Sequence, residues 1–198
     1  MKGRSPKVLV AVQDPGAANV VAPVAARLLN DGKTVLSVIC QGFARDVLHR
    51  FSVPFKEPRD YGLRKVTSSA AERILARESP NILLVGTSED MQSLDRLLTV
   101  KARSLGIPVI SMLDYWSNYS KRFSGMSSNE RFLYLPDLIF LMDEHARNDM
   151  LAEGFPPERL FVTGHPYLEG LLIQSSLLPE WERARFRSSL GVPEGSCL

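Results

Sequence analysis

Short apolar runs rich in Val, Ile and Leu recur along the chain at regular intervals. They lie at residues 8–12, 35–40, 82–85, 109–113, 138–142 and 160–162, with a weaker run at residues 53–56. The runs are continuous rather than alternating, which is typical of strands buried on both faces of a parallel sheet. They begin 18 to 29 residues apart when the weaker run is counted, close to the length of a strand with its return helix.

The segments between these runs have helical periodicity. Helices are predicted at residues 17–30, 64–78, 89–105 and 146–153, with another at residues 177–190. Gly32, Gly106 and Gly154 follow three of them, and glycine just past a helix is a stop signal. The alternation predicts an α/β fold: a doubly wound, mainly parallel, Rossmann-like sheet of six to seven strands with helices on both faces. The weak run would form an edge strand.

Two segments depart from this alternation. Residues 114–136 carry aromatic, amide and basic side chains with little helical periodicity. A long loop inside a compact fold is usually functional, and the alternative is a mobile surface excursion. A turn at residues 192–195 is followed by almost no chain, so another strand and domain are expected to follow. The sequence therefore predicts one domain over residues 1–176, and a helix and linker over residues 177–198.

Composition and charge exclude several classes of protein. Apolar residues make up 44% and charged residues 23%, and 24 basic against 22 acidic side chains give a net charge of +2. That balance provides no electrostatic footprint for nucleic acid. No apolar run approaches the roughly 20 residues of a membrane span, and the basic N-terminus lacks a secretory hydrophobic segment. Two cysteines without metal-ligand spacing predict no metal site. A cytoplasmic protein is expected.

The loop after the first strand is the first candidate site, because ligands bind outside the carboxyl ends of parallel strands. Small residues at Gly16 and Ala17 allow a ligand to approach the backbone, and Asn19 adds a polar group. The following helix N-terminus favours an anion. Asp14 is a candidate base or acceptor clamp, and alternatively the helix N-cap with Pro15 in the first helical position. Neither a dinucleotide fingerprint nor a P-loop is present.

The loop after the strand at residues 82–85 contains hydroxyl and acidic side chains. Thr87 and Asp90 have the spacing of a capping box, which predicts a structural role at a helix start. Ser88, Glu89 and Asp90 are also candidate substrate-binding residues, since hydroxyls and carboxylates contact sugars.

Residues 114–122 form the richest candidate site. Asp114 leaves its strand directly, so it is a candidate general base or hydrogen-bond acceptor for substrate hydroxyls. Tyr115 and Trp116 offer flat faces for stacking, Asn118 adds an amide, and Arg122 could pair with a phosphate in bidentate fashion. The alternative is that the aromatic side chains anchor the loop and Arg122 is solvated.

The last two predicted strands are followed by weaker candidates. Asp143 and Glu144 open a helix, where acidic side chains suit the positive end of the helix dipole. His165 lies in a tight loop at a strand end and is a candidate for catalysis or phosphate contact. His49 and His145 lie in helical stretches and are expected at the surface. Signatures of serine hydrolases, zinc proteases and cysteine nucleophiles are absent from the sequence.

Three segments carry a resemblance to a known superfamily. They are Pro-Asn-Ile-Leu-Leu-Val-Gly at residues 80–86, Gly-Ile-Pro-Val-Ile at residues 106–110, and the run at residues 155–166 containing Val-Thr-Gly-His-Pro. Together they resemble the N-terminal half of GT-B glycosyltransferases, and the last run is similar to the closing segment of the first domain in UDP-N-acetylglucosamine 2-epimerases. Residues 187–195 resemble the linker into the second domain.

The resemblance implies the acceptor-side half of a two-domain enzyme in surface polysaccharide or glycolipid synthesis. The expected partners are a sugar or glycolipid acceptor, a C-terminal donor domain and a second copy of the chain. No cofactor is expected in this half, which would be inactive alone, and the full-length protein would bind a nucleotide-sugar donor. Epimerase acidic positions carry over to Asp90 and Asp114, but the surrounding residues differ, so a transferase is preferred.

Two alternatives stay open at this stage. One is half of a UDP-sugar 2-epimerase-like isomerase. The other is a stand-alone Rossmann-like module that binds a ligand or a partner without catalysis. Acceptor loops of such enzymes can also touch the inner face of the membrane, so a peripheral location is included. A flavodoxin-like nucleotide protein is disfavoured because the sequence lacks a phosphate-binding signature.

Overall fold

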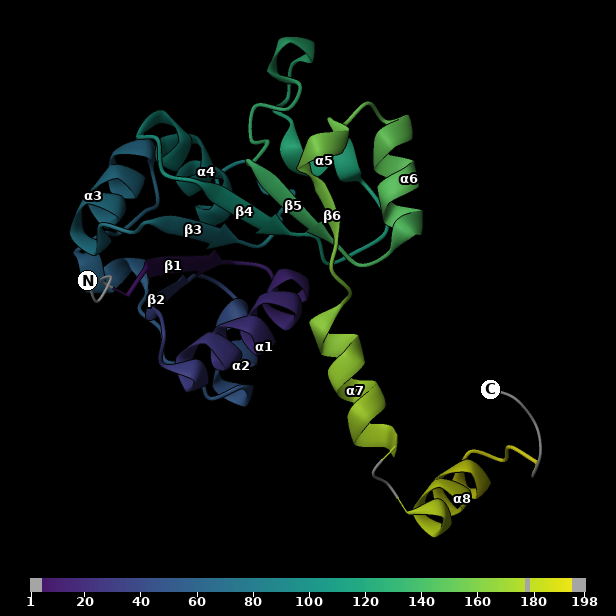
Figure 1. Ribbon diagram of the computed structural model, residues 1–198. Helices are drawn as coiled ribbons and strands as arrows, with labels where there is room; N and C mark the ends of the chain where they lie inside the picture. Colours follow the sequence, from purple (N-terminus) through teal and green to yellow (C-terminus); the bar gives the residue numbers. More distant parts are fainter. Residues whose placement is uncertain (1–4, 177–178, 194–198) are drawn as a thin grey trace. The chain divides into compact units, whose positions relative to one another are not determined.

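One parallel sheet organises the protein (Figure 1). The computed structural model describes residues 5–176 and 179–193. The strand order is β2-β1-β3-β4-β5-β6, and every neighbouring pair is parallel. The strands are β1 (Lys7–Val12), β2 (Val35–Cys40), β3 (Ile82–Val85), β4 (Val109–Met112), β5 (Leu138–Leu141) and β6 (Leu160–Val162). This arrangement confirms the predicted doubly wound, Rossmann-like α/β fold.

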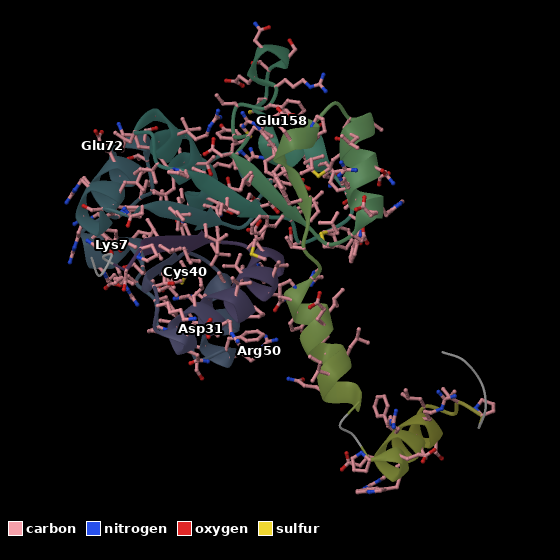
Figure 2. The ribbon with its side chains drawn as sticks, in the orientation of Figure 1. Lys7, Asp31, Cys40, Arg50, Glu72 and Glu158 are labelled. Carbon is pink, nitrogen blue, oxygen red and sulfur yellow. The ribbon has the colours of Figure 1, made fainter. Side chains whose placement is uncertain are left out.

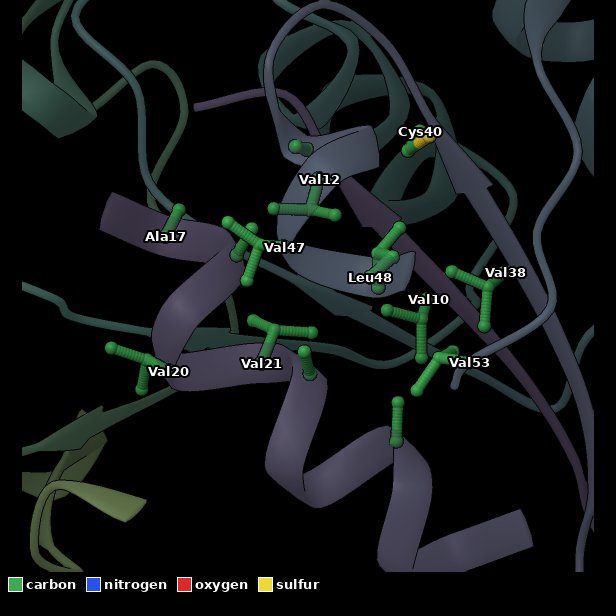
Figure 3. Packing of buried hydrophobic residues seen from close by; sticks show 14 of the residues in the cluster. Val10, Val12, Ala17, Val20, Val21, Val38, Cys40, Val47, Leu48 and Val53 are labelled. Atoms are coloured by element: carbon green, nitrogen blue, oxygen red, sulfur yellow. The ribbon is translucent and has the colours of Figure 1, made fainter. Parts of the chain in front are cut away.

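Helices cover both faces of the sheet, because successive residues of each strand point to opposite sides. Val10 and Val12 of β1 pack in one core cluster with α1 (Pro15–Asp31) and α2 (Ala44–Arg50) (Figure 3). Leu9 and Ala11 pack in a second cluster with α3 (Ser68–Glu78) and α4 (Leu94–Ser104). Burial on both sides explains why the strand sequences are continuously apolar.

A third cluster lies around the last strands. It joins β5 and β6 to α5 (Tyr119–Phe123) and α6 (Glu144–Ala152), with Phe123 and Phe155 in edge contact at a ring-centroid distance of 5.6 Å. The described residues up to β6 also contain three short 3₁₀ helices, η1 (Pro58–Tyr61), η2 (Ser128–Glu130) and η3 (Pro157–Arg159). Charged side chains such as Arg50, Glu72 and Glu158 lie outside, whereas Cys40 is enclosed (Figure 2).

The predicted seventh strand does not form. Residues 53–56 make one isolated bridge, in which the Lys56 N–H donates to Val38 O at 2.8 Å and the Cys40 N–H donates to Lys56 O at 2.9 Å. Pro54 has no N–H to donate, so a regular ladder cannot extend through this segment. The sheet therefore ends at β2.

Several helix boundaries differ from the sequence prediction. α3 begins at Ser68 rather than at residue 64, because the Thr67 hydroxyl accepts a hydrogen bond from the Ala70 N–H at 3.2 Å. α4 begins at Leu94 rather than at residue 89, with Ser93 as its N-cap. The stop at Gly32 is confirmed: its φ of 61° is the left-handed conformation that glycine adopts readily.

The chain after β6 forms two further helices, α7 (Pro166–Ser176) and α8 (Glu180–Ser189). Contacts within the chain group Met1–Pro166 in one compact unit and Tyr167–Leu198 in another. The predicted helix at residues 177–190 is described from Glu180 onward, and the predicted turn at residues 192–195 lies partly outside the described residues. The role of residues 177–198 as a linker stays a prediction. Within the described residues, no helix has the length and apolar character to cross a bilayer.

Candidate functional site

The strand order places a topological switch point between β1 and β3 at the carboxyl edge of the sheet. The chain leaves β1 toward α1 on one face and leaves β3 toward α4 on the other, which is the switch point where open α/β sheets bind ligands. Gly86 ends β3, and a Cβ there would lie 2.5 Å from Cβ of Ala17. Glycine therefore allows the start of α1 to pack closely against the end of β3.

A hydrogen-bonded group, here called the Asp114 cluster (Asp114, Thr87 and Arg122), lies beside this switch point. Oδ1 of Asp114 accepts hydrogen bonds from Thr87 Oγ1 at 2.7 Å and from Arg122 Nη1 at 2.8 Å. Arg122 Nη1 also donates to Thr87 Oγ1 at 2.8 Å. The Asp114 and Arg122 side chains are each 10% exposed. The cluster thus fixes one face of the Asp114 carboxylate.

The second oxygen of Asp114 lies against the start of α1. A Cβ added to Gly16 would overlap Asp114 Oδ2, so only glycine leaves room for this carboxylate. A helix N-terminus attracts anions, and in dinucleotide-binding folds it receives a phosphate. Here Oδ2 of the protein's own Asp114 lies beside Gly16 in the first turn of α1. Arg122, predicted as a phosphate ligand, is likewise paired with Asp114.

Arg96 of α4 holds together the two segments that carry Thr87 and Arg122. Its guanidinium donates from Nε to Ser88 O at 3.0 Å and from Nη2 to Lys121 O at 2.6 Å. It also lies over the Tyr134 ring, 4.7 Å from the centroid. Burial lowers the pKa of Arg96. These contacts join the loop after β3 to α5, and α5 carries Arg122.

The loop after β1 is held by a residue that the sequence did not single out. Gln13 donates from Nε2 to Asp90 Oδ2 at 3.0 Å, and its Oε1 accepts from the Leu94 N–H at 3.1 Å. Asp14 occupies the N-cap position of α1, but its side chain makes no capping hydrogen bond. Oδ1 of Asn19 is buried without a partner among the described residues. A glutamine before an acidic residue gives no distinctive sequence signal.

The predicted capping box of Thr87 and Asp90 is wrong. The Thr87 hydroxyl donates to Asp114, and the cap of α4 is Ser93, whose Oγ accepts from the Arg96 N–H at 3.4 Å. The Asp90 N–H instead donates to Ser88 Oγ at 3.1 Å. Thr87 and Ser93 are both spaced suitably for capping a helix. Thr87 does not cap α4, because its hydroxyl is hydrogen-bonded to Asp114, so Ser93 provides the cap.

Glu89 organises the outer rim of the site. It accepts a hydrogen bond from Asn118 Nδ2 at 2.7 Å and pairs with Lys121. The Lys121 ammonium, helped by the Asn118 amide, lowers the pKa of Glu89. Glu89 and Asn118, predicted in the loops after β3 and β4, are thus brought together at the surface, where Lys121 of α5 joins them.

Trp116 links the ends of three neighbouring strands. Its Nε1 donates to Asp143 Oδ2 at 2.7 Å, and its ring stacks on His165 at a centroid distance of 6.1 Å. Asp143 Oδ1 accepts from the Ala146 N–H at 2.8 Å, so its predicted capping role is confirmed. Burial opposes the charge, yet these hydrogen bonds hold the pKa of Asp143 below its ordinary value. Trp116 is an anchor of the loop, whereas Tyr115 is 58% exposed.

Asp95 is a buried acid that the sequence analysis missed. It lies in the first turn of α4, is 2% exposed, and neither carboxylate oxygen has a hydrogen-bond partner among the described residues. Burial raises its pKa to about 7, and the nearby charges of Asp14 and Asp114 act in the same direction. An acid in an amphipathic helix pattern is usually solvated, so the sequence carried no signal for this burial.

A cavity of about 280 Å³ lies at the carboxyl end of β2, outside the predicted site. The charged residues of its wall are mainly basic, and Glu57 pairs there with Arg45 at 3.2 Å and with Arg59 at 2.7 Å. Burial raises the pKa of the Cys40 thiol to about 12, so this thiol stays protonated and is a poor nucleophile. In the described part of the chain, no group of three His, Cys, Asp or Glu side chains could hold a metal ion.

The architecture of this chain is similar to that of solved UDP-GlcNAc 2-epimerase structures. UDP-GlcNAc 2-epimerase from Neisseria meningitidis, bound to UDP-GlcNAc, matches with a TM-score of 0.62 at 17% identity, over 93% of this chain and 54% of that one. The enzyme from Methanocaldococcus jannaschii, in complex with UDP-GlcNAc and UDP, matches with a TM-score of 0.58 at 19% identity, over 92% and 53%. The fold is that of a GT-B/epimerase-like domain.

A third match leads to the same architecture. UDP-N-acetylglucosamine 2-epimerase from Rickettsia bellii matches with a TM-score of 0.53 at 20% identity, over 96% of this chain and 52% of that one. The chain thus spans about half the length of these solved structures. No family model matches the sequence, and no curated protein matches it. At these identities the likeness defines the fold of the GT-B/epimerase-like domain, and the roles of its residues follow from its own contacts.

Proposed function

We propose that this chain is the acceptor-binding half of a GT-B type glycosyltransferase-like enzyme. Such an enzyme moves a sugar from a nucleotide donor to a hydroxyl of a sugar or glycolipid, as in surface polysaccharide or glycolipid synthesis. The fold, and the match to about half the length of UDP-GlcNAc 2-epimerase structures, support this proposal. The observation that carries it is the position of the Asp114 carboxylate, fixed beside the switch point and set against the start of α1.

The charge arrangement supports acceptor binding rather than donor binding. A donor diphosphate needs unpaired cations or an accessible helix N-terminus. Asp114 takes the start of α1 and pairs with Arg122. A hydroxyl, in contrast, needs a hydrogen-bond acceptor. Oδ1 of Asp114 already accepts two hydrogen bonds, so Oδ2 is the oxygen with remaining capacity.

In the proposed reaction, Asp114 Oδ2 accepts the proton of the attacking hydroxyl. Thr87 and Arg122 keep the carboxylate in one orientation, which is the requirement for a general base acting on a bound substrate. Tyr115, exposed at the same edge, offers a face for a sugar ring. Asp14 and His165 flank the site and stay candidates for clamping the acceptor. A donor domain closing over this edge would exclude water.

Nuclear magnetic resonance (NMR) mapping with two probes tests this proposal. Methyl β-N-acetylglucosaminide represents the acceptor, and UDP represents the donor nucleotide. We expect the sugar to shift amide signals near Asp114 at millimolar concentration, and UDP to leave them unchanged. D114N should lose the sugar-dependent shifts while keeping a folded amide spectrum, and D46N, an exposed acid on α2, should keep them. Binding of UDP at Asp114 without sugar binding would contradict the proposal.

A second candidate function is half of a UDP-sugar 2-epimerase-like isomerase. The matched structures are named as UDP-GlcNAc 2-epimerases, and two contain UDP-GlcNAc, which favours this alternative. An isomerase must break the C2–H bond of its sugar, so it predicts deuterium at C2 when UDP-GlcNAc is incubated in D₂O with this half completed by its second domain. A transferase half predicts that the C2 proton is retained. Proton NMR of the recovered nucleotide sugar distinguishes the two.

A further inference from the structure

Directly behind the Asp114 cluster, the fold contains an acid that nothing in the proposed chemistry uses. Both oxygens of Asp95 are buried, and neither has a partner among the described residues. Arg96, its neighbour in α4, makes its hydrogen bonds to Ser88 O and Lys121 O instead. Burying a polar group without a hydrogen bond is unfavourable, and a folded protein rarely contains one without a reason.

The space around Asp95 has the size and polarity of a single-water site. A cavity of about 10 Å³ is lined by Asp95, Thr87, Ser111 and Arg122. That volume is close to the minimum that holds one water molecule, and a buried water needs two to four polar partners. Ser111 Oγ donates to Gly86 O at 3.1 Å, so its oxygen can accept from a water. Thr87 belongs both to this cavity and to the Asp114 cluster.

We propose that Asp114, Thr87, one buried water and Asp95 form a proton relay. It deepens the proposed function, on which its catalytic role rests. The acceptor O–H bond breaks, its proton goes to Asp114 Oδ2, and the oxygen electron pair forms the bond to the anomeric carbon. The bond from that carbon to the donor phosphate oxygen breaks, and its electron pair leaves with the nucleoside diphosphate.

The relay then clears the proton from Asp114. A half-turn of the carboxyl about its Cβ–Cγ bond exchanges its two oxygens and brings the protonated one to Thr87. Asp114 gives this proton to the Thr87 oxygen, the Thr87 hydroxyl turns and gives its own proton to the water, and the water gives one to an ionised Asp95. Each intermediate group ends with as many protons as it began with, and Asp95 holds the proton. The order follows the contacts: Thr87 Oγ1 is 2.7 Å from Asp114 Oδ1 and faces the cavity that Asp95 lines. Asp114 is left ionised and ready for another acceptor.

The charged groups around Asp95 suit a carboxyl that both takes and releases a proton. Those facing it are Asp14 before α1, Arg96 on its own helix, Asp114 after β4, Arg122 on α5 and Tyr134 after η2. Burial, Asp14 and Asp114 raise the pKa of Asp95, its own backbone amide and Arg96 lower it, and the result is about 7. Near neutral pH the group is therefore present in both protonation states.

Carbon-13 NMR of carboxyl-labelled aspartate, recorded on the full chain between pH 4 and 9, tests the relay. We expect the Asp95 carboxyl to titrate near pH 7 and the Asp114 carboxyl to show an inflection at the same pH. T87V removes the hydroxyl, so the Asp114 inflection should shrink to the part that is carried by charge alone, while Asp95 still titrates. T87S restores the hydroxyl and should restore the inflection. D46N serves as the control acid and should change neither signal.

A second measurement tests the water. We expect a water-to-amide nuclear Overhauser effect from a long-lived water at Thr87 or Ser111, lost in D95L, where the side chain fills the cavity. The relay is overturned if Asp95 is ionised throughout the pH range, if no long-lived water is seen, or if T87V keeps the Asp114 inflection undiminished. The last result would mean coupling through space alone. None of these readouts requires a sugar, so failure of sugar binding with an intact relay signal would count against the proposed function only.

Discussion

At the scale of single residues, the most informative side chain is one that weakens the fold. Asp95 is buried with no partner among the described residues, and its pKa is raised to about 7 against roughly 3.9 in an unfolded chain. The folded state therefore holds a proton that the unfolded state releases as the pH rises from about 4 to 7. The free energy of unfolding must fall across this window and stay low above it.

D95N removes this pH-dependent penalty. We expect the wild type to lose stability between pH 4 and 7, and D95N to lose about 1–3 kcal/mol less over the same interval. The buried amide stays unpaired, so the variant gains little at pH 4, where the wild-type carboxyl is already neutral. Urea unfolding at pH 4, 5.5, 7 and 8 gives the comparison, with D46N as the control. Parallel stability curves for D95N and the wild type would contradict the burial of an uncompensated acid.

Gly16 supports a second prediction at this scale. A Cβ at this position would overlap Asp114 Oδ2, so G16A must push the carboxylate out of the start of α1. We expect a loss of about 1–3 kcal/mol in the free energy of unfolding and a changed Asp114 carboxyl signal. G170A is the matched control, because a Cβ at Gly170 meets nothing within 4 Å. Equal stability of the two variants, measured by urea unfolding, would show that Asp114 does not depend on this contact.

At the scale of elements, one glutamate ties α3 to the edge of the sheet. Glu78 accepts hydrogen bonds from Ser37 Oγ at 2.6 Å, Lys56 Nζ at 2.8 Å and Tyr61 Oη at 2.6 Å. Burial alone would raise the pKa of Glu78, but these three hydrogen bonds lower it to about 2. The stabilisation is therefore present above pH 4.5 and is lost as the pH falls toward 2.

E78Q should destabilise the protein by about 1–3 kcal/mol at pH 7, because charge-assisted hydrogen bonds become neutral ones. The difference from the wild type should shrink as the pH falls from 4.5 to 2, where the wild-type carboxylate is itself protonated. E72Q, on the same helix with a 58% exposed side chain, should change stability by less than about 0.5 kcal/mol. Thermal unfolding at pH 2.5, 4 and 7 measures this, and an E78Q deficit independent of pH would contradict the ionic role.

The elements also show which features a sequence can predict. All six strands were predictable because their sequences are mainly apolar runs. Burial on both faces accounts for this in the inner strands, whereas Phe161 and Val162 of the edge strand β6 are 45% and 39% exposed. Helix caps were harder to predict than strands. Thr87 and Asp90 have the spacing of a capping box, but the Thr87 hydroxyl donates to Asp114, which is distant in sequence. The short helix α5 and the helix α7 carried no periodic signal that was recognised, and the predicted edge strand was limited to a bridge by Pro54.

The candidate site likewise has features that the sequence predicts and features that it does not. Parallel topology brings strand ends together, so the grouping of Asp114 and Arg122 with the loop after β3 could be anticipated from the sequence. Side-chain direction could not: the stacking of Trp116 on His165 and the burial of Asp95 depend on tertiary packing. Local patterns give the positions of polar groups, and packing decides whether each one is solvated, paired or orphaned.

At the scale of the whole molecule, the buried core ends before the last two helices. Leu160 is the final buried hydrophobic residue among those described, and large apolar side chains beyond it are exposed, such as Leu172 at 69% and Trp181 at 62%. Since burial of apolar surface is the main source of stability, the unit Met1–Pro166 should contain nearly all the folding free energy.

Truncation after Pro166 tests this division. We expect the shortened chain to unfold in one cooperative transition within a few degrees of the full-length midpoint, because no buried residue in the described part is removed. A chain truncated after Leu151 loses β6, Phe155 and Leu160 from the third core cluster, so it should lose cooperativity or fail to fold. Calorimetry and near-ultraviolet circular dichroism measure both. A large drop in the midpoint after the first truncation would instead assign α7 and α8 a share in stabilising the sheet, and the acceptor half would then extend to include them.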